Sequence, residues 1–122
     1  MIYVYIRVAP GLSPLSKTNH MTSYLQEGGM TAGKQLIERA DDSEPWRRRE
    51  IAILIRGLMP GDLLAVDNLD DLDPVPKSLI EILYAIRDRG AYLMQTTPWD
   101  PLRSKPQVRD LILSLIPPTK EP

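Results

Sequence analysis

The chain has 122 residues, enough for one domain with a core of its own and no covalent staples. It contains no cysteine, which excludes disulfides and thiolate metal sites, and no stretch approaches the roughly 20 apolar residues of a membrane span. The net charge of −1 argues against a domain that holds DNA by its phosphates on its own, since such domains usually carry a positive excess.

The first third of the chain predicts two strands and a helix. Residues 2–6 are β-branched and aromatic, which is typical of a central strand buried on both faces. The prolines, glycine and serines of residues 9–19 predict a loop. A weak helix is expected from about Thr18 to Gln26, where two glycines end it, and a short second strand at residues 35–37.

A second helix is predicted from Trp46 onward, because apolar residues recur there with the spacing of one helix face. Asp42 or Ser43 is expected to cap its start, and a Pro-Gly pair at 60–61 to stop it before a buried strand at 63–66. The apolar stripe consists of Ile51, Leu54, Ile55 and Leu58.

A third helix is predicted to open at Ser78, which forms a capping box with Glu81, and to end at Gly90 before a fourth strand at 91–94. Alternating strands and helices predict an α/β fold. We expect a single three-layer domain over residues 1–97, with a mostly parallel sheet of four or five strands flanked by helices.

The remaining residues, 98–122, are rich in proline, and these prolines bracket one short helix at about 106–116. Its apolar stripe could pack on its own domain or form a dimer contact, and the sequence leaves both open. No helix-turn-helix is expected in this tail. The candidate interaction residues of the stripe are Val108, Leu111, Ile112 and Leu115.

Three motifs stand out within the predicted α/β pattern from Ile2 to Met94. They are Tyr5-x-Arg7-Val8 at the end of the first strand, Leu58-x-Pro60-Gly61-Asp62 before the third, and Leu69-Asp70-x-Leu72 after it. In their order and spacing, these motifs together resemble the catalytic domain of serine recombinases, the resolvase and invertase family.

The resemblance implies a resolvase-like fold and a chemistry in which a serine hydroxyl attacks a DNA phosphate. Arginines would stabilise the charge that develops on the phosphate oxygens. By position, Arg7 and Arg48 match two such arginines, and Asp70 matches the acidic residue of the family. The nucleophile position is occupied by Ala9.

Two further positions depart from the family, since Asp71 and Pro74 stand where arginines are expected. The resemblance therefore implies a module that has lost catalysis and acts by binding, as a homodimer or docked on a protein partner or DNA-processing complex. Its role would be accessory or regulatory. DNA binding at the basic cluster Arg47, Arg48 and Arg49 is expected to be weak. We expect no cofactor, no membrane partner and a cytoplasmic location without a signal peptide.

The alternative is a DNA-processing enzyme that transfers phosphoryl groups by other residues. Ser13 or Ser16, in the predicted loop after Ala9, could supply a relocated nucleophile. An aspartate cluster could instead hold Mg²⁺, although a solvated loop is the simpler interpretation and we expect no metal. The aspartates concerned are Asp67, Asp70, Asp71 and Asp73.

Overall fold

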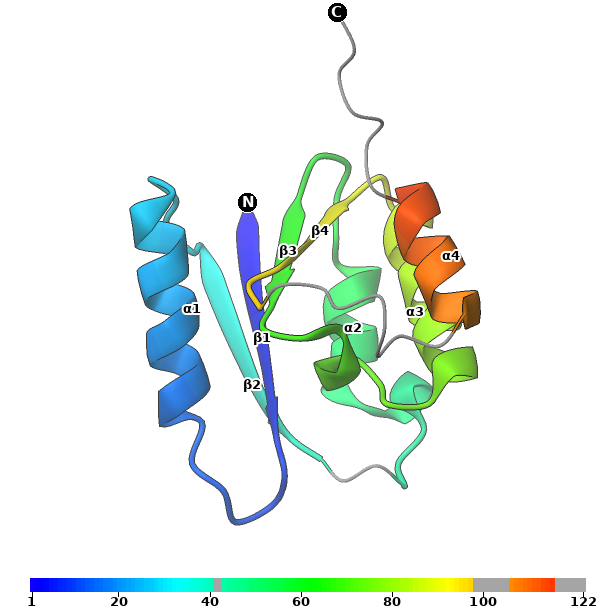
Figure 1. Cartoon of the computed structure of the whole chain (residues 1–122), viewed down its shortest axis with the longest axis horizontal. Coiled ribbons are helices and arrows are strands. Elements are labelled where there is room, and N and C mark those ends of the chain that lie inside the picture. The colour runs from blue at the N-terminus through cyan, green and yellow to red at the C-terminus, as the bar shows by residue number, and fades with distance from the viewer. Residues whose placement is uncertain (41–42, 98–105, 116–122) are drawn as a thin grey trace, which may run out of the picture.

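A parallel four-stranded sheet forms the centre of the fold (Figure 1). The computed structural model describes residues 1–40, 43–97 and 106–115. The strands lie in the order β2-β1-β3-β4. They are β1 (Ile2–Val8), β2 (Lys34–Arg39), β3 (Leu63–Val66) and β4 (Tyr92–Gln95).

Helices cover both faces of this sheet (Figure 1). Helix α1 (Leu15–Glu27) forms the single-helix layer, and α2 (Glu50–Arg56), α3 (Pro76–Asp88) and α4 (Pro106–Leu115) form the opposite layer. Two short 3-10 helices, η1 (Trp46–Arg48) and η2 (Leu69–Asp71), precede α2 and α3. The prediction of a three-layer α/β fold with a parallel sheet is confirmed.

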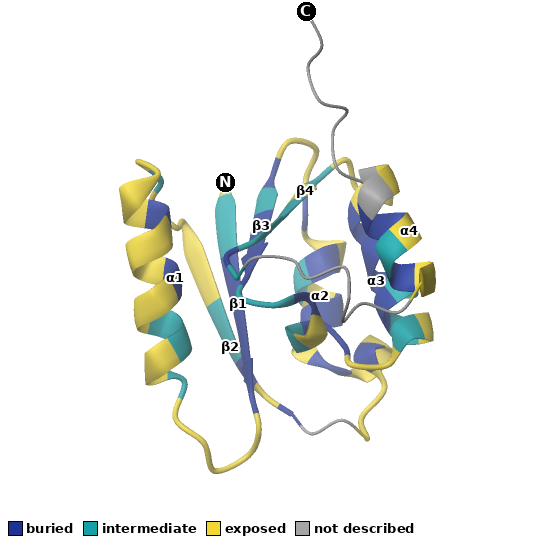
Figure 2. Ribbon diagram, in the orientation of Figure 1, coloured by how far each residue is buried: buried dark blue, intermediate teal, exposed yellow. Residues whose placement is uncertain are grey.

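The core is divided by β1, whose side chains alternate between the two faces of the sheet. Tyr5 packs on the side of α2, α3 and α4, whereas Val4 and Ile6 pack with Met21 and Leu25 of α1. Each of these five side chains is buried, because helices cover both faces of the sheet at β1. Figure 2 shows β1 as a largely buried strand. The prediction of a strand buried on both faces is therefore confirmed.

Helix α1 begins at Leu15, earlier than the predicted start at Thr18. The hydroxyl of Thr18 donates to the carbonyl of Pro14 at 2.9 Å, so Thr18 lies inside the first turn of the helix. Ser16 belongs to this turn as well, and its placement in a loop is wrong. Sequence reasoning missed the start because a single leucine between a proline and a serine carries no apolar periodicity.

The predicted helix from Trp46 is broken into two pieces. Arg49 is extended, with φ −89° and ψ 165°, so η1 ends before it and α2 starts at Glu50. The Glu38 carboxylate accepts a hydrogen bond from the Glu50 amide at 2.5 Å. The N-terminus of α2 is therefore stabilised from strand β2. Its N-cap position is Arg49, whose side chain makes no capping hydrogen bond, and the predicted cap Asp42 lies outside the described residues.

The third helix starts at Pro76, and the capping box predicted at Ser78 is wrong. Ser78 lies inside the first turn, and the N-cap position is Val75, which has no side-chain oxygen. The Asp73 carboxylate instead accepts the Val75 amide at 2.8 Å and fixes the approach to the helix. Proline is tolerated at the first helical position because its missing N–H has no partner there in any case.

Helix α4 packs against α3 and shares its apolar cluster. Val108, Leu111 and Ile112 are buried in the core of this chain, so these three side chains follow the first of the two alternatives that the sequence left open, packing on their own domain. The Leu115 side chain lies outside the described residues, as do residues 98–105 and 116–122. Within the described part of the chain, α4 therefore extends the α3 side of the domain.

Candidate functional site

The carboxyl ends of β1, β3 and β4 form the place where a ligand site is expected in this topology. The chain leaves β1 toward β2 on one side and leaves β3 toward β4 on the other. Such a change of direction opens the sheet edge between the two strands, and α/β folds bind ligands there. The candidate residues from Arg7 to Ala9 lie at the end of β1, and those from Asp67 to Asp73 follow β3 at the same edge.

Arg7 is the last inward-facing side chain of β1 on the side of α2. It lies in register with Glu38 of β2 and is only 8% exposed. Ala9, at the position of the family's nucleophile, is exposed just after the strand. Its carbonyl accepts a hydrogen bond from the Leu12 amide at 3.1 Å, but its methyl side chain has no group that could attack a phosphate.

The three consecutive arginines have different environments. Arg48 is exposed, and Arg47 is exposed over the Trp46 ring, 5.0 Å from its centroid, and 3.6 Å from the Glu81 carboxylate. Arg49 is 4% exposed, so its assignment to a surface contact is wrong. The extended backbone at Arg49 turns this side chain into the core, which helical spacing could not indicate.

Arg49 joins a buried network with Tyr5 and Glu38. The Tyr5 hydroxyl donates to the Glu38 carboxylate at 2.5 Å, and the Arg49 guanidinium lies 3.7 Å from the same carboxylate oxygen. Burial and then the hydrogen bond to Glu38 raise the pKa of the Tyr5 hydroxyl far above its ordinary value, while the charges of Arg49 and Arg7 oppose this. Arg7 and Arg49 are therefore neighbours of one buried phenol.

The same guanidinium holds the segment that follows β3. It donates to the carbonyl of Leu72 and lies 3.4 Å from the Asp73 carboxylate. Its charge is therefore shared between Glu38 and Asp73, both of which are buried. An arginine committed in this way supports the fold and is not available to a phosphate in solution. A charged residue on the apolar side of a strand, Glu38 next to Leu36, is the sequence signal that could have indicated this network.

Lys17 and Asp71 form an ion pair where the resemblance expects an arginine. The Lys17 ammonium lies 2.7 Å from the Asp71 carboxylate and donates to the carbonyl of Arg7 at 2.9 Å. Burial raises the pKa of the Asp71 carboxyl above its ordinary value, although Lys17 opposes this by its hydrogen bond and its charge. Sequence reasoning missed Lys17 because α1 was predicted to start after it.

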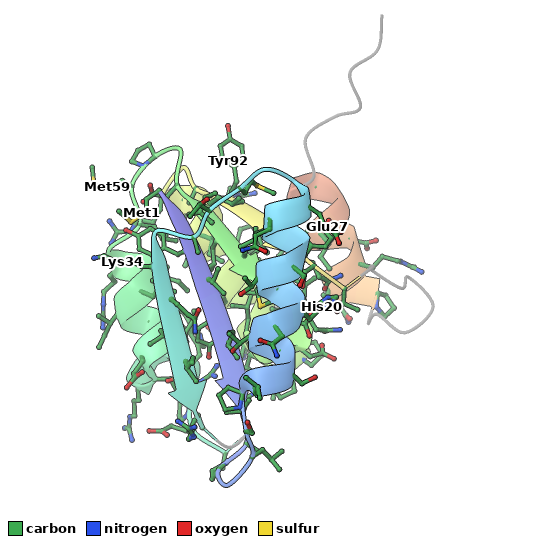
Figure 3. The ribbon with its side chains drawn as sticks, turned by 90° about the vertical axis from the view of Figure 1, so that its left-hand side faces the viewer. Met1, His20, Glu27, Lys34, Met59 and Tyr92 are labelled. Atoms are coloured by element: carbon green, nitrogen blue, oxygen red, sulfur yellow. The ribbon has the colours of Figure 1, made fainter. Side chains whose placement is uncertain are left out.

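The four aspartates after β3 have separate surroundings. Asp67 accepts hydrogen bonds from the hydroxyls of Thr96 and Thr97, each at 2.9 Å, and the His20 imidazole lies 3.3 Å from it. Figure 3 shows His20 on the flank of α1. Asp71 pairs with Lys17, Asp73 lies beside Arg49, and Asp70 is exposed. Among the described residues, no three acidic or histidine side chains are grouped to hold a metal ion.

The two serines proposed as relocated nucleophiles lie at the start of α1. The Ser13 hydroxyl oxygen accepts the Leu15 amide at 3.2 Å, so it serves as a local turn acceptor before the helix. Ser16 is exposed in the first turn. Neither position follows a strand end directly, as Ala9 does.

Comparison with known proteins supports the fold class. No protein-family model and no curated protein sequence matches the chain. The N-terminal catalytic domain of TP901-1 integrase is similar in structure, with a TM-score of 0.69, 14% identity, and 92% of this chain and 88% of that one covered. The C-terminal catalytic domain of ISC1926 TnpA, an IS607-like serine recombinase, gives 0.64 and 18%, with 93% and 77% covered.

The chain therefore has the fold of serine recombinase catalytic domains, as the resemblance implied. At these identities the likeness concerns the fold alone. In the part of the chain that the structure describes, no helix combines the length and the apolar character that crossing a membrane requires.

Proposed function

We propose that this chain is a catalytically inactive serine-recombinase-like module that acts by binding. It would associate with itself as a homodimer, or dock on a protein partner or a DNA-processing complex, in an accessory or regulatory role. The proposal places it in the cytoplasm, with weak DNA binding at most.

The observation that carries the proposal is the Lys17–Asp71 ion pair, which Lys17 joins to the Arg7 carbonyl, two residues before Ala9. A phosphoryl transfer needs a nucleophile and a set of cations around the phosphate oxygens. Ala9 supplies no nucleophile, and Asp71 places a negative charge where the family has a positive one. Lys17, the cation within reach, is bound to that carboxylate and to the Arg7 carbonyl.

The remaining charges support the same conclusion. Arg49 is shared between two buried carboxylates, and the net charge of the whole chain is −1. DNA contacts through phosphates depend on an excess of free cations and on the counterions they release. Binding to a protein fits this distribution of charge better than binding to DNA by this chain alone.

A suicide DNA substrate tests the proposal, since it would trap a covalent protein–DNA adduct. We expect no adduct that survives denaturation, with or without Mg²⁺. An adduct that disappears in Ser13→Ala or Ser16→Ala would establish a relocated nucleophile and overturn the proposal. Cleavage that depends on Mg²⁺ and is lost in Asp67→Asn would overturn it in favour of a metal-dependent enzyme.

A further inference from the structure

Strand β2 forms an open edge of the sheet. In the order β2-β1-β3-β4 it pairs with β1 alone, and no other described strand lies beyond it. Figure 3 shows β2 as the outermost strand, with Lys34 at its start. Alternate residues of a strand direct their main-chain N–H and C=O groups to opposite sides, so about half of these groups in β2 point away from β1. This edge therefore has the donors and acceptors that a further extended strand requires.

The side chains of β2 leave room for such a strand on both faces of the sheet. Leu36 and Ile37, at the centre of the strand, are half-buried and pack on opposite apolar clusters of the core. A neighbouring strand with apolar side chains would cover the part of each that is still exposed. The other edge strand, β4, has four residues against six in β2 and offers fewer main-chain groups.

The exposed charges of β2 are both positive. Lys34 and Arg39 lie at its two ends and are exposed, and neither forms an ion pair with another described residue. Glu38, the acidic residue of the strand, is 5% exposed and lies 3.7 Å from the Arg49 guanidinium. In a chain with a net charge of −1, this edge therefore presents cations to whatever pairs with it.

These cations select the kind of strand that fits. Two copies of the chain paired edge to edge would bring Lys34 and Arg39 of both to one seam, and like charges on neighbouring strands are destabilising. DNA phosphates would neutralise the cations but have no N–H groups for the carbonyls of the edge. An extended peptide segment with acidic side chains satisfies both the main-chain groups and the charges.

We propose that β2 binds an extended, acidic segment of a partner protein, which adds to the sheet as a fifth strand. Its carboxylates would pair with Lys34 and Arg39, and its apolar side chains would cover Leu36 and Ile37. The inference rests on the proposed function, because it names the contact through which the module docks on a protein.

A fluorescein-labelled peptide of about ten residues, alternating glutamate and valine, is the probe for the full chain. We expect saturable binding by fluorescence anisotropy. N-methylation of one central glutamate and one central valine blocks both edges of the peptide at constant charge, and it should raise the Kd about tenfold or more.

The charges are tested by the double variant Lys34→Gln and Arg39→Gln, which should raise the Kd of the unmodified peptide about fivefold or more. The same changes at Lys77 and Arg89, exposed at the two ends of α3, are the matched control and should alter it by less than about twofold. In an NMR titration, amide shifts should change at 34–39 and not at 92–95. Circular dichroism checks that the variants fold.

Several results would overturn the inference. They are the absence of saturable binding, equal affinity for the N-methylated peptide, no effect of the β2 double variant, and amide shifts that change at β4 instead. Displacement of the peptide by a DNA duplex would assign the cations to phosphates, and a concentration-dependent dimer that blocks the peptide would assign the edge to a second copy. Failure of the proposed function shows itself as a covalent DNA adduct, which none of these measurements detects, so the two failures are distinguishable.

Discussion

Asp71 is the residue at which the site departs most clearly from a phosphate pocket. Its carboxylate is largely buried, and one of its oxygens has no hydrogen-bond partner among the described residues. Lys17 compensates for part of the desolvation, but the pKa of Asp71 is still raised by burial. Asp71 thus has two effects. It replaces an arginine that the family places in the pocket, and its ionised form lowers the stability of the fold.

The sign of its pH dependence follows from linkage. A carboxyl with a raised pKa binds its proton more tightly in the folded state than in the unfolded state. Its favourable contribution is therefore complete below the ordinary carboxyl pKa and is lost as the pH rises through the raised pKa. We expect Asp71→Asn to become more stable relative to the natural chain as the pH rises through that range.

Urea unfolding at a series of pH values measures the difference in free energy of unfolding between Asp71→Asn and the natural chain. Asp70→Asn is the control, because Asp70 is an exposed neighbour of the same charge. The control should show no comparable rise in relative stability. If the free energies of unfolding of Asp71→Asn and the natural chain differ by the same amount at every pH, the raised pKa of Asp71 is contradicted.

At the scale of elements, Arg49 joins parts of the chain that are distant in sequence. It lies at the junction of η1 and α2 and contacts Glu38 of β2, Tyr5 of β1 and the segment between η2 and α3. Glu38 in turn accepts the first amide of α2. The N-terminus of α2 thus receives a hydrogen-bond acceptor from another element of the fold.

We expect Arg49→Ala to lower the free energy of unfolding by about 3–5 kcal/mol, because it leaves Glu38 and Asp73 as buried charges without their shared cation. Arg48→Ala is the matched control and should change stability by about 0.5 kcal/mol or less, since Arg48 is exposed. Both are measured by chemical denaturation. Equal effects of the two substitutions would show that the network does not support the fold.

At the scale of the whole molecule, catalysis would need several groups restored together. Ala9 is one change among three, since Asp71 and Pro74 also occupy positions of arginines in the family. A serine at position 9 would lack the cations that stabilise a transferring phosphate, because Lys17 is paired with Asp71.

Ala9→Ser is therefore expected to form no covalent adduct with the suicide DNA substrate and to cleave no DNA. The triple variant with Asp71→Arg and Pro74→Arg is the informative companion, because it also restores the missing positive charges. An adduct formed by Ala9→Ser alone would show that the surrounding charges matter less than proposed.

Much of this architecture could be predicted from the sequence, because its signals are local. A β-branched run at 2–6, apolar stripes at helical spacing and glycines at element ends determined a parallel α/β sheet flanked by helices. The motifs around Arg7, Gly61 and Asp70 indicated the recombinase fold that the similar structures show. The strand runs, helical stripes and motifs can each be recognised from residues that are close together in the sequence.

Only the tertiary structure decided which charges meet. Lys17 pairs with Asp71 across 54 positions, and Arg49 reaches Tyr5 across 44, so no local spacing could reveal either contact. Burial of α4 against α3 was decided in the same way, because an apolar stripe does not indicate which surface covers it. Ala9 could be read from the sequence alone, but the paired and buried charges around it depend on long-range packing.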